Sequence, residues 1–426
     1  MYHKGRSIPL LLLLCAGLRG QPAKVTSEQL LEEALTNNRE IAAIRQRIAE
    51  AKGLLRQAGV RPAPTLDASG ASGQPLRTKG EESYSASLSQ QFETAGKRAK
   101  RVRVAEYGVG LAEAELAERV SSLKRDIRLA FAEAMADQER VRVFGDLLQL
   151  LRDSLRLTEA RVKEGDAARL EADLIRVEIS RVEAQQGAAT GEVEADLLEL
   201  QRLVGMDPAL SIVLPDLPEP TLSLDSAALR KTAFAQRPDL LTARLVERQA
   251  SAGVDLAEAE GKPDVTVSAG YSHETGQFDD QLGLSPSGVP VQLRDVDNIL
   301  SVGVSIPLSG RRRNLGNIEA ASARAASARL RREFLERSIP AEIDAALRRY
   351  DALRRSLTLT REGVLAPSEK NLEIIRQAYN LGQLRLLDVL NEQRRLLETR
   401  LSYVDSVAEL RRALAEIERA VGGTLP

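Results

Sequence analysis

"YNLGQLRLLDVLN" (379–391) places Gly382 inside leucine-rich sequence that otherwise favours a helix. A similar order, a glycine followed by a leucine and an acid, occurs upstream around Gly165 in "VKEGDAARLEADL" (162–174). Glycine tolerates the left-handed backbone conformation in which helices commonly end. Both segments therefore predict the end of one helix, a tight turn and the start of another helix.

The two segments belong to an internal duplication of the whole chain. The offset of 217 between Gly165 and Gly382 continues without a gap to Gly205 and Gly422. A second offset of 199 relates the helical sequences that open the two copies, and an offset of 214 relates "TAGKR" to "LSGRR". Such self-similarity indicates two copies of one structural unit.

The duplication divides the chain into four parts. Each copy reads in the order helix, two strands, long helix, turn and helix. The proline-rich segment between the copies predicts a linker or equatorial segment. The predicted parts are a signal peptide at 1–22, a first repeat at 23–205, a linker at 206–225 and a second repeat at 226–426.

The composition excludes several functional classes. Charged residues make up 28% of the 426 residues, yet the formal net charge is −1, which argues against a nucleic-acid partner. Only 3% of the residues are aromatic, which is typical of long helices and coiled coils. With one cysteine and two histidines, the chain is not expected to build a metal site from these ligands. The sequence contains no recognisable nucleophile–base pair or phosphate-binding loop, so neither an enzyme nor a bound cofactor is expected.

The N-terminal sequence "MYHKGRSIPLLLLLCAGLRGQPA" has basic residues, a short leucine run and then small residues, which predicts a secretory signal peptide. We interpret Cys15 as part of this segment rather than as a lipidation site, because Leu14 precedes it. The apolar run is too short to cross a bilayer as a helix. No other stretch predicts a membrane-spanning helix, so any insertion would have to use strands.

Four strands are predicted from alternating apolar and polar residues. They fall within about 64–92 in the first repeat and at about 263–274 and 298–307 in the second. Their polar positions are almost all Ser, Thr or Gly, unlike the Lys and Glu that are frequent elsewhere. This pattern favours strands with one lipid-facing side; the alternative is a half-buried sheet in a soluble domain. The segment 274–297 is predicted to be an extracellular loop.

The lengths of these parts predict an assembly. The helix from Gly96 to Gly165 would be about 100 Å long, and its counterpart in the second repeat is similar, with a kink or irregularity expected at Pro340. Four strands cannot close a barrel in lipid, so identical chains must complete it. The predicted fold is therefore mainly α with a membrane β-barrel portion: a trimeric 12-stranded β-barrel, four strands per chain, continuing into a long antiparallel α-helical coiled-coil barrel.

In order and spacing, the sequence resembles the TolC family of outer-membrane efflux ducts over essentially all of the mature chain. The resemblance is carried by the duplication, by "AFAQRPDL" (233–240), by "ETAGKR" and "PLSGRR" after the strand pairs, and by "YNLGQLRLLDVLNEQ". The sequence "GDAARLEADLIRVEISRVEA" (165–184) looks more like the branch that serves heavy-metal and cation pumps.

The resemblance implies a passive duct in the outer membrane of a Gram-negative-type bacterium, with a periplasmic helical extension. It implies a homotrimer in outer-membrane lipid that is docked through a periplasmic adaptor (membrane fusion) protein onto an inner-membrane pump of the RND or ABC type. Two alternatives remain open from the residues: the outer-membrane channel of a type I protein secretion system and a soluble periplasmic coiled-coil scaffold.

The resemblance also assigns candidate site residues. The two turns would form the periplasmic tip and contact the adaptor through Gly165, Asp166, Gly382, Gln383 and Leu384.

Three copies of Asp388 on a threefold axis would form a narrow, cation-binding ring at an iris-like gate. Asn391 stands where the family often has a second acid, which predicts a weaker ring. The alternative is that Asp388 is simply solvated on a helix face.

Basic residues directly follow each strand pair, where cations oppose the helix dipole. They are expected to meet lipid phosphates at the membrane boundary, or else to mark a solvated helix start. These residues are Lys97, Arg98, Arg311, Arg312 and Arg313.

Overall fold

The computed structural model describes residues 25–76, 80–207, 212–220, 222, 224–308 and 314–423. The predicted signal peptide at 1–22 lies outside these residues. The chain forms two compact units. The first contains Met1–Asn38, Asp126–Thr221 and Ala352–Arg412, and the second contains Arg39–Arg125, Leu222–Asp351 and Ala413–Pro426. Each unit draws segments from both sequence repeats.

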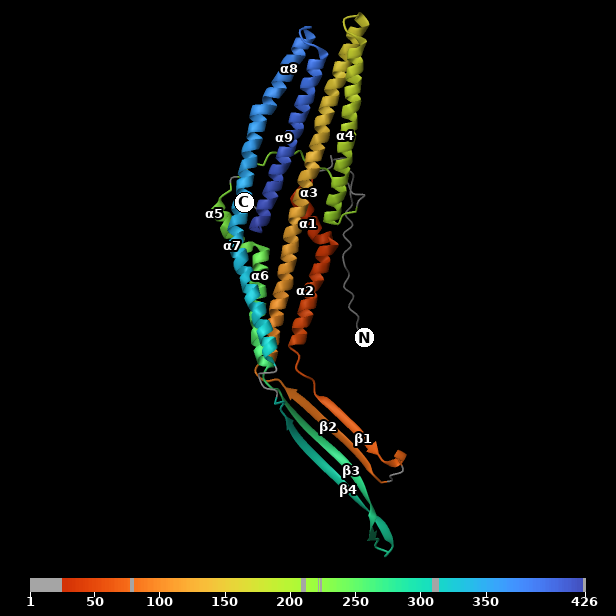
Figure 1. Ribbon diagram of the computed structural model, residues 1–426. Coiled ribbons are helices and arrows are strands. Elements are labelled where there is room, and N and C mark those ends of the chain that lie inside the picture. The colour runs from red at the N-terminus through yellow and green to blue at the C-terminus, as the bar shows by residue number, and fades with distance from the viewer. Residues whose placement is uncertain are drawn as a thin grey trace, which may run out of the picture. The chain divides into compact units, whose positions relative to one another are not determined.

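Helices make up most of the described chain, and a single four-stranded sheet lies in the second unit (Figure 1). The elements are α1 (Ser27–Asn37), α2 (Arg39–Ala58), β1 (Thr65–Ser72), the short 3₁₀ turn η1 (Gln74–Leu76), β2 (Glu82–Phe92), α3 (Lys97–Glu164), α4 (Arg169–Val204), α5 (Ser226–Gln236), α6 (Pro238–Glu260), β3 (Val265–Leu284), β4 (Pro290–Ser305), α7 (Leu315–Leu359), the π-helical segment η3 (Thr360–Leu365), α8 (Ala366–Asn380) and α9 (Leu386–Val421).

The repeat offsets reappear in the helix bounds. Helices α4 and α9 both contain 36 residues and differ in position by 217. Helices α1 and α5 both contain 11 residues and differ by 199. Each of these short helices begins with a side-chain cap: Thr26 forms a capping box with Gln29, and Asp225 accepts two backbone N–H groups.

Each repeat also closes its last helix against the corner between its first two helices. The Asn38 amide donates to the Leu203 carbonyl at 2.8 Å, and the Arg237 guanidinium donates to the Ala420 carbonyl at 3.3 Å. The glycine that caps α9, Gly422, has φ +76°, and an added Cβ would lie 2.5 Å from the Arg237 Cα. The backbones can approach this closely only because no side chain intervenes.

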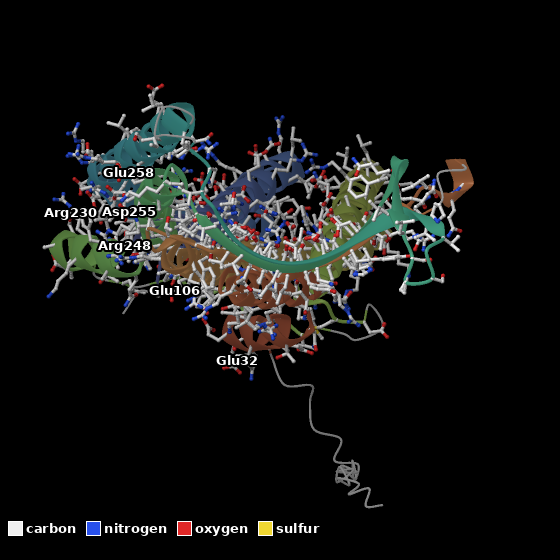
Figure 2. All side chains as sticks on the ribbon, turned by 90° about the horizontal axis from the view of Figure 1, so that it is seen from below. Glu32, Glu106, Arg230, Arg248, Asp255 and Glu258 are labelled. Carbon is white, nitrogen blue, oxygen red and sulfur yellow. The ribbon has the colours of Figure 1, made fainter. Side chains whose placement is uncertain are left out.

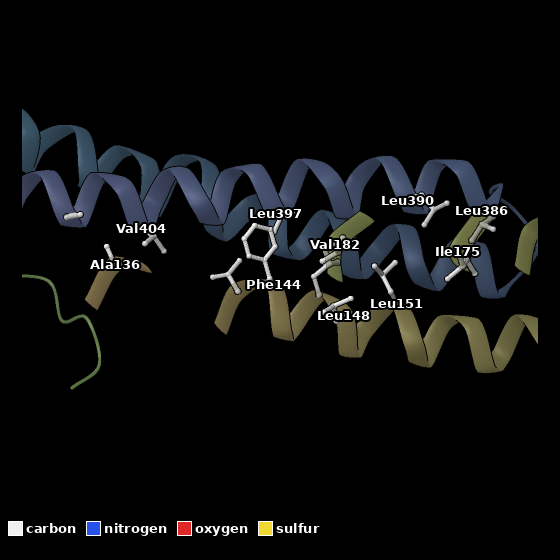
Figure 3. Packing of buried hydrophobic residues seen from close by; sticks show 13 residues of the cluster. Ala136, Phe144, Leu148, Leu151, Ile175, Val182, Leu386, Leu390, Leu397 and Val404 are labelled. Carbon is white, nitrogen blue, oxygen red and sulfur yellow. The ribbon is translucent and has the colours of Figure 1, made fainter. Parts of the chain in front are cut away.

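In the first unit, α3, α4 and α9 share an apolar core (Figure 3). Leu151, Ile175 and Val182 are completely buried where α3 and α4 meet α9. Burial of each such side chain stabilises the fold by about 1.5–3 kcal/mol. Ion pairs flank the core: Arg152 with Glu183 joins α3 to α4, and Glu369 with Arg400 joins α8 to α9. Helix α8 therefore packs on α9 and α4 packs on α3, while α9 contacts both α3 and α4.

The linker is fastened to the first unit at Glu219. Its carboxylate accepts hydrogen bonds from Arg361 in η3, at 2.8 Å, and from Tyr403 in α9. Burial and this contact with Glu219 raise the pKa of Tyr403 above its usual range. Helix α7 continues through Pro340, and an irregular segment, η3, follows about twenty residues further on.

In the second unit, the sheet has the order β1-β2-β3-β4 with antiparallel neighbours. Its register separates two faces. Ser87, Gly270 and Ser301 lie in one row of the polar face, whereas Leu88 and Val302 lie in a row of the apolar face. The apolar face is exposed, with Val302 at 75% of its full accessibility.

Seen from below, the sheet is curved, and charged side chains such as Arg248, Asp255 and Glu258 lie on the outside of α6 (Figure 2). Strands β1 and β4 form the two edges of this sheet.

The prediction of a loop at 274–297 is wrong. Strands β3 and β4 continue through most of it, with Glu274 opposite Asp297 and Gln277 opposite Arg294. A short turn with Gly288 at φ +81° joins them. The Gly, Pro and Asp content suggested a loop, but only a few of these residues form the turn, and local pairing of two adjacent strands satisfies the backbone of the others.

Among the helices in the described part of the chain, none combines the length and the apolar character that crossing a membrane requires.

Candidate functional site

The two predicted turns adopt the same backbone geometry. At the first turn, the N–H of Gly165 donates to Val162 and the N–H of Asp166 donates to Arg161. At the second, Gly382 donates to Tyr379 and Gln383 to Ala378. The glycines have φ of +85° and +76°. This pair of bonds is the Schellman arrangement, which satisfies the last carbonyl groups of a helix.

The residues at these turns are open to solvent. Gly165, Asp166, Gly382, Gln383 and Leu384 are all exposed, and an added Cβ at either glycine would meet no neighbouring atom. The left-handed backbone alone therefore explains glycine at these positions, and the turns present a free surface in the chain described here.

Asp388 has a local role that the sequence analysis missed. It lies in the first turn of α9, where its carboxylate accepts the backbone N–H of Arg385 at 3.0 Å. An acid at this position caps the helix and complements the positive end of its dipole. Both Asp388 and Asn391 are exposed, and a spacing of three residues places them on one helix face.

A buried carboxylate joins α4 to α9 close to the turns. Glu178 is only 3% exposed and receives hydrogen bonds from Arg181 on its own helix and Arg394 on α9, the shortest at 2.6 Å. Burial opposes ionisation of this carboxyl, but the two guanidinium groups outweigh burial and lower the pKa of Glu178. We name these three side chains the Glu178 clasp.

Nearer the turns, Tyr379 connects α8 to α3 and α4. Its hydroxyl donates to Glu171 at 3.1 Å, and the Arg161 guanidinium lies 5.4 Å from its ring centre. Burial is the main reason that the pKa of Tyr379 is raised. The repeat alignment could have drawn attention to this contact, because Glu171 is the counterpart of Asp388.

The basic residues after the strands differ in their surroundings. Lys97 is buried at 8% exposure, and its ammonium donates to Asp264 and to the Lys262 carbonyl, both at 2.7 Å. The expectation that Lys97 meets lipid phosphates is therefore corrected, because its charge is neutralised inside the second unit. Arg98 is exposed. The other predicted boundary residues, Arg311, Arg312 and Arg313, lie outside the described residues.

No group of three or more His, Cys, Asp or Glu side chains is arranged to hold a metal ion within the residues that the structure describes. The chemistry of this region is that of ion pairs between helices and of exposed turns.

Helical hairpins with exposed turns and a curved antiparallel sheet with an exposed apolar face define a class, that of mainly helical proteins with one small sheet. The sequence profile described as "Outer membrane efflux protein" matches residues 30–206 and 229–423. The chain belongs to this outer membrane efflux protein family.

Three relatives show the range of the likeness. The cobalt-zinc-cadmium resistance protein CzcC of Cupriavidus metallidurans is 25% identical, over 93% of this chain and 90% of the relative. The cation efflux system protein CusC of Escherichia coli K12 is 23% identical, over 88% and 82%. A CusC crystal structure covers 97% of this chain and 96% of its own, with a TM-score of 0.73 and 20% identity. The outer-membrane channel OprN gives a TM-score of 0.73 at 22% identity, covering 93% and 90%.

These findings confirm the resemblance drawn from the sequence and the outer-membrane location. They also set aside the alternative of a soluble periplasmic scaffold, because the matched family is one of the outer membrane. Members of the family are channels rather than enzymes.

Proposed function

We propose that three copies of this chain form an outer-membrane duct that passively conducts solutes exported by an inner-membrane pump through a periplasmic adaptor protein. The observation that carries the proposal is the sheet: it is curved, its apolar face is exposed, and its edge strands β1 and β4 are available for pairing. Unpaired strand edges are not tolerated in lipid, so β1 of one copy would pair with β4 of the next. Twelve strands leave room for a lumen.

The helices support association of the same copies. By the repeat offset, α4 corresponds to α9 and α8 to α3, so the contact of α3 with α9 has a counterpart in α8 against α4. Within one chain, these two helices meet near the turns through Tyr379 and Glu171, and both also carry exposed apolar residues. On α4 these are Leu170, Leu174 and Val177, and on α8 the residue is Ile374. A neighbouring copy would cover both stripes.

The adaptor would contact the two turns through residues that are exposed there: Gly165, Asp166, Gly382, Gln383 and Leu384. Asp388 and Asn391 would line an iris-like gate where three copies meet, with the Glu178 clasp holding α9 against α4 in the closed state. Arg98 would lie at the membrane boundary, together with Arg311, Arg312 and Arg313.

The charge at the gate is tested by Asp388→Asn, which keeps an oxygen for the Arg385 N–H and removes the negative charge. We expect the reconstituted channel to lose block by divalent cations, because a ring of three carboxylates would become neutral. Asn391→Asp should have the opposite effect and increase the block. Single-channel recordings in planar bilayers measure both. Unchanged block in the two variants, in a preparation whose mass corresponds to three chains, would reject these residues as the gate.

For the cargo, we propose divalent metal cations rather than secreted proteins, because the relative CzcC is named for cobalt, zinc and cadmium resistance and is matched over nearly its whole length. The pump would then be of the cation-exporting kind. Deletion of the gene should lower the tolerance of the cells to these metals. Normal metal tolerance together with a defect in protein secretion would favour the type I system instead.

A further inference from the structure

A cavity of about 290 Å³ lies within the first unit, between α3, α8 and α9. Its walls are mainly apolar, and its polar lining comes from all three helices. Charged groups include Arg376 and Arg400, and the apolar wall consists of Val143, Leu147, Leu150, Leu372, Leu396 and Leu397. A volume at the lower end of the range for ligand pockets suits a small molecule.

Gln393 makes this cavity unusual. Its side chain lines the cavity and is only 3% exposed, yet neither its amide oxygen nor its amide nitrogen has a hydrogen-bond partner in the described structure. Buried amides are normally satisfied, because an unpaired donor or acceptor retains the full cost of losing water. Among the described residues, the chain therefore supplies no partner for this amide.

The repeat explains how the unpaired amide of Gln393 arises. In the first repeat, two ion pairs cross from α3 to α4, Arg152 with Glu183 and Glu159 with Arg176. In the second repeat, the first pair is kept with its charges exchanged, as Glu369 and Arg400.

In the second ion pair, only one of the two charges is exchanged between the repeats. Arg376 replaces the acid Glu159, but Gln393 stands where an acid would be needed to match it. Within the part of the chain that the structure describes, no hydrogen bond or ion pair is found for Arg376.

The other guanidinium of the cavity is already paired: Arg400 lies between Glu369, at 2.8 Å, and Asp146, at 3.5 Å. Glu373 accepts a hydrogen bond from the uncharged Gln377 amide at 3.0 Å and keeps its negative charge. The Arg376 guanidinium and the Gln393 amide both line the cavity, together with its apolar residues. Both can donate to the same carboxylate, and guanidinium and carboxylate groups match in geometry.

We infer that this cavity binds a small organic acid, whose carboxylate takes the place of the missing acid at position 393 and whose apolar body lies among the leucines. Such a ligand would touch α3, α8 and α9 at once and would hold these helices together. The inference concerns one chain and does not depend on conduction.

The test uses the full chain in detergent and two matched probes, 4-fluorobenzoate and 4-fluorobenzamide, followed by fluorine NMR titration. The probes share their ring and differ in charge. We expect the acid to bind at least tenfold more tightly than the amide. Arg376→Gln should weaken binding of the acid by about tenfold to a hundredfold, as expected for loss of a charge-assisted hydrogen bond.

Two further variants secure the interpretation. Gln393→Glu supplies the missing acid from within the chain, so it should prevent binding of 4-fluorobenzoate while preserving or raising thermal stability. Arg395→Gln removes an exposed charge from the same helix outside the cavity and should leave binding unchanged. The inference would be overturned if the acid does not bind, if the two probes bind equally, or if the Arg376→Gln and Gln393→Glu variants bind the acid as tightly as the native chain does, because the cavity would then not recognise a carboxylate.

Discussion

Glycines with the same backbone conformation have different reasons to be glycine in this chain. At Gly165 the surroundings are open, so only the left-handed conformation excludes other residues. At Gly422 the Arg237 backbone is in the way as well. The capping residue of α9 is thus also a packing residue, and it fastens the end of the second repeat to the corner between α5 and α6.

Alanine substitutions should separate these two effects. Gly165→Ala is expected to cost about 1–2 kcal/mol of stability, the strain of a left-handed alanine. Gly422→Ala should cost more, about 2–5 kcal/mol, because the α5–α6 corner must also shift. Thermal unfolding followed by circular dichroism in detergent measures both. Similar losses for the two variants would show that the close approach at Arg237 is readily relieved.

At the scale of the elements, the Glu178 clasp joins α4 to α9 through a carboxylate that is only 3% exposed. A lowered pKa in the folded state means that the clasp stabilises the protein above the pKa of an unfolded glutamate, about 4.3. This contribution is lost as the pH falls from there through the folded-state pKa of Glu178. The clasp is therefore intact at neutral pH and opens only in acid.

Glu178→Gln should reduce stability at pH 7 by about 1.5–3 kcal/mol, the contribution of hydrogen bonds to a charged group. The difference from the native chain should shrink as the pH falls below about 4.3, because the unfolded glutamate then takes up a proton and the folded carboxyl follows only at lower pH. Glu183→Gln, on the same helix, removes a half-exposed ion pair with Arg152 and should cost about 0.5 kcal/mol or less. Denaturation curves across pH test this, and a pH-independent effect of Glu178→Gln would contradict it.

The elements also show what a sequence can predict. Helix ends at Gly165 and Gly382 were predictable because a glycine within strong helical sequence has one local meaning. The hairpin at 274–297 was not, because its pairing depends on two strands meeting rather than on composition. Lys97 was misread for a similar reason: a cation after a strand suggests a membrane boundary, and only the fold reveals that Asp264, distant in sequence, lies beside it.

The features of the candidate site that the sequence did not predict also depend on contacts between distant residues. Asp388 and Asn391 could be chosen from a motif, but the Glu178 clasp brings together residues more than two hundred positions apart. The cavity at Gln393 could be noticed only after the two repeats were compared in space. Charge exchange between Glu159 and Arg376 is visible in the sequence, yet its meaning depends on which residue faces it.

At the scale of the whole molecule, the two faces of the sheet should differ in how well they tolerate an introduced arginine. Val302→Arg places a cation on the exposed apolar face and should reduce the stability of the lipid-embedded protein by about 2–4 kcal/mol. Ser301→Arg, one residue away on the polar face, should be tolerated. The fraction of heat-resistant oligomer in outer-membrane extracts reports the difference. Equal assembly of both variants would mean that the apolar face does not meet lipid.

The unequal lengths of the strands have a consequence for the outer rim. Strands β3 and β4 contain 20 and 16 residues, whereas β1 and β2 contain 8 and 11. In a ring of three such sheets, the long β3–β4 hairpins would extend beyond the shorter strands β1 and β2, so the rim would be uneven. Departing cargo could then leave sideways as well as upward, and antibodies or phages arriving from outside would meet the hairpin tips around Gly288 first.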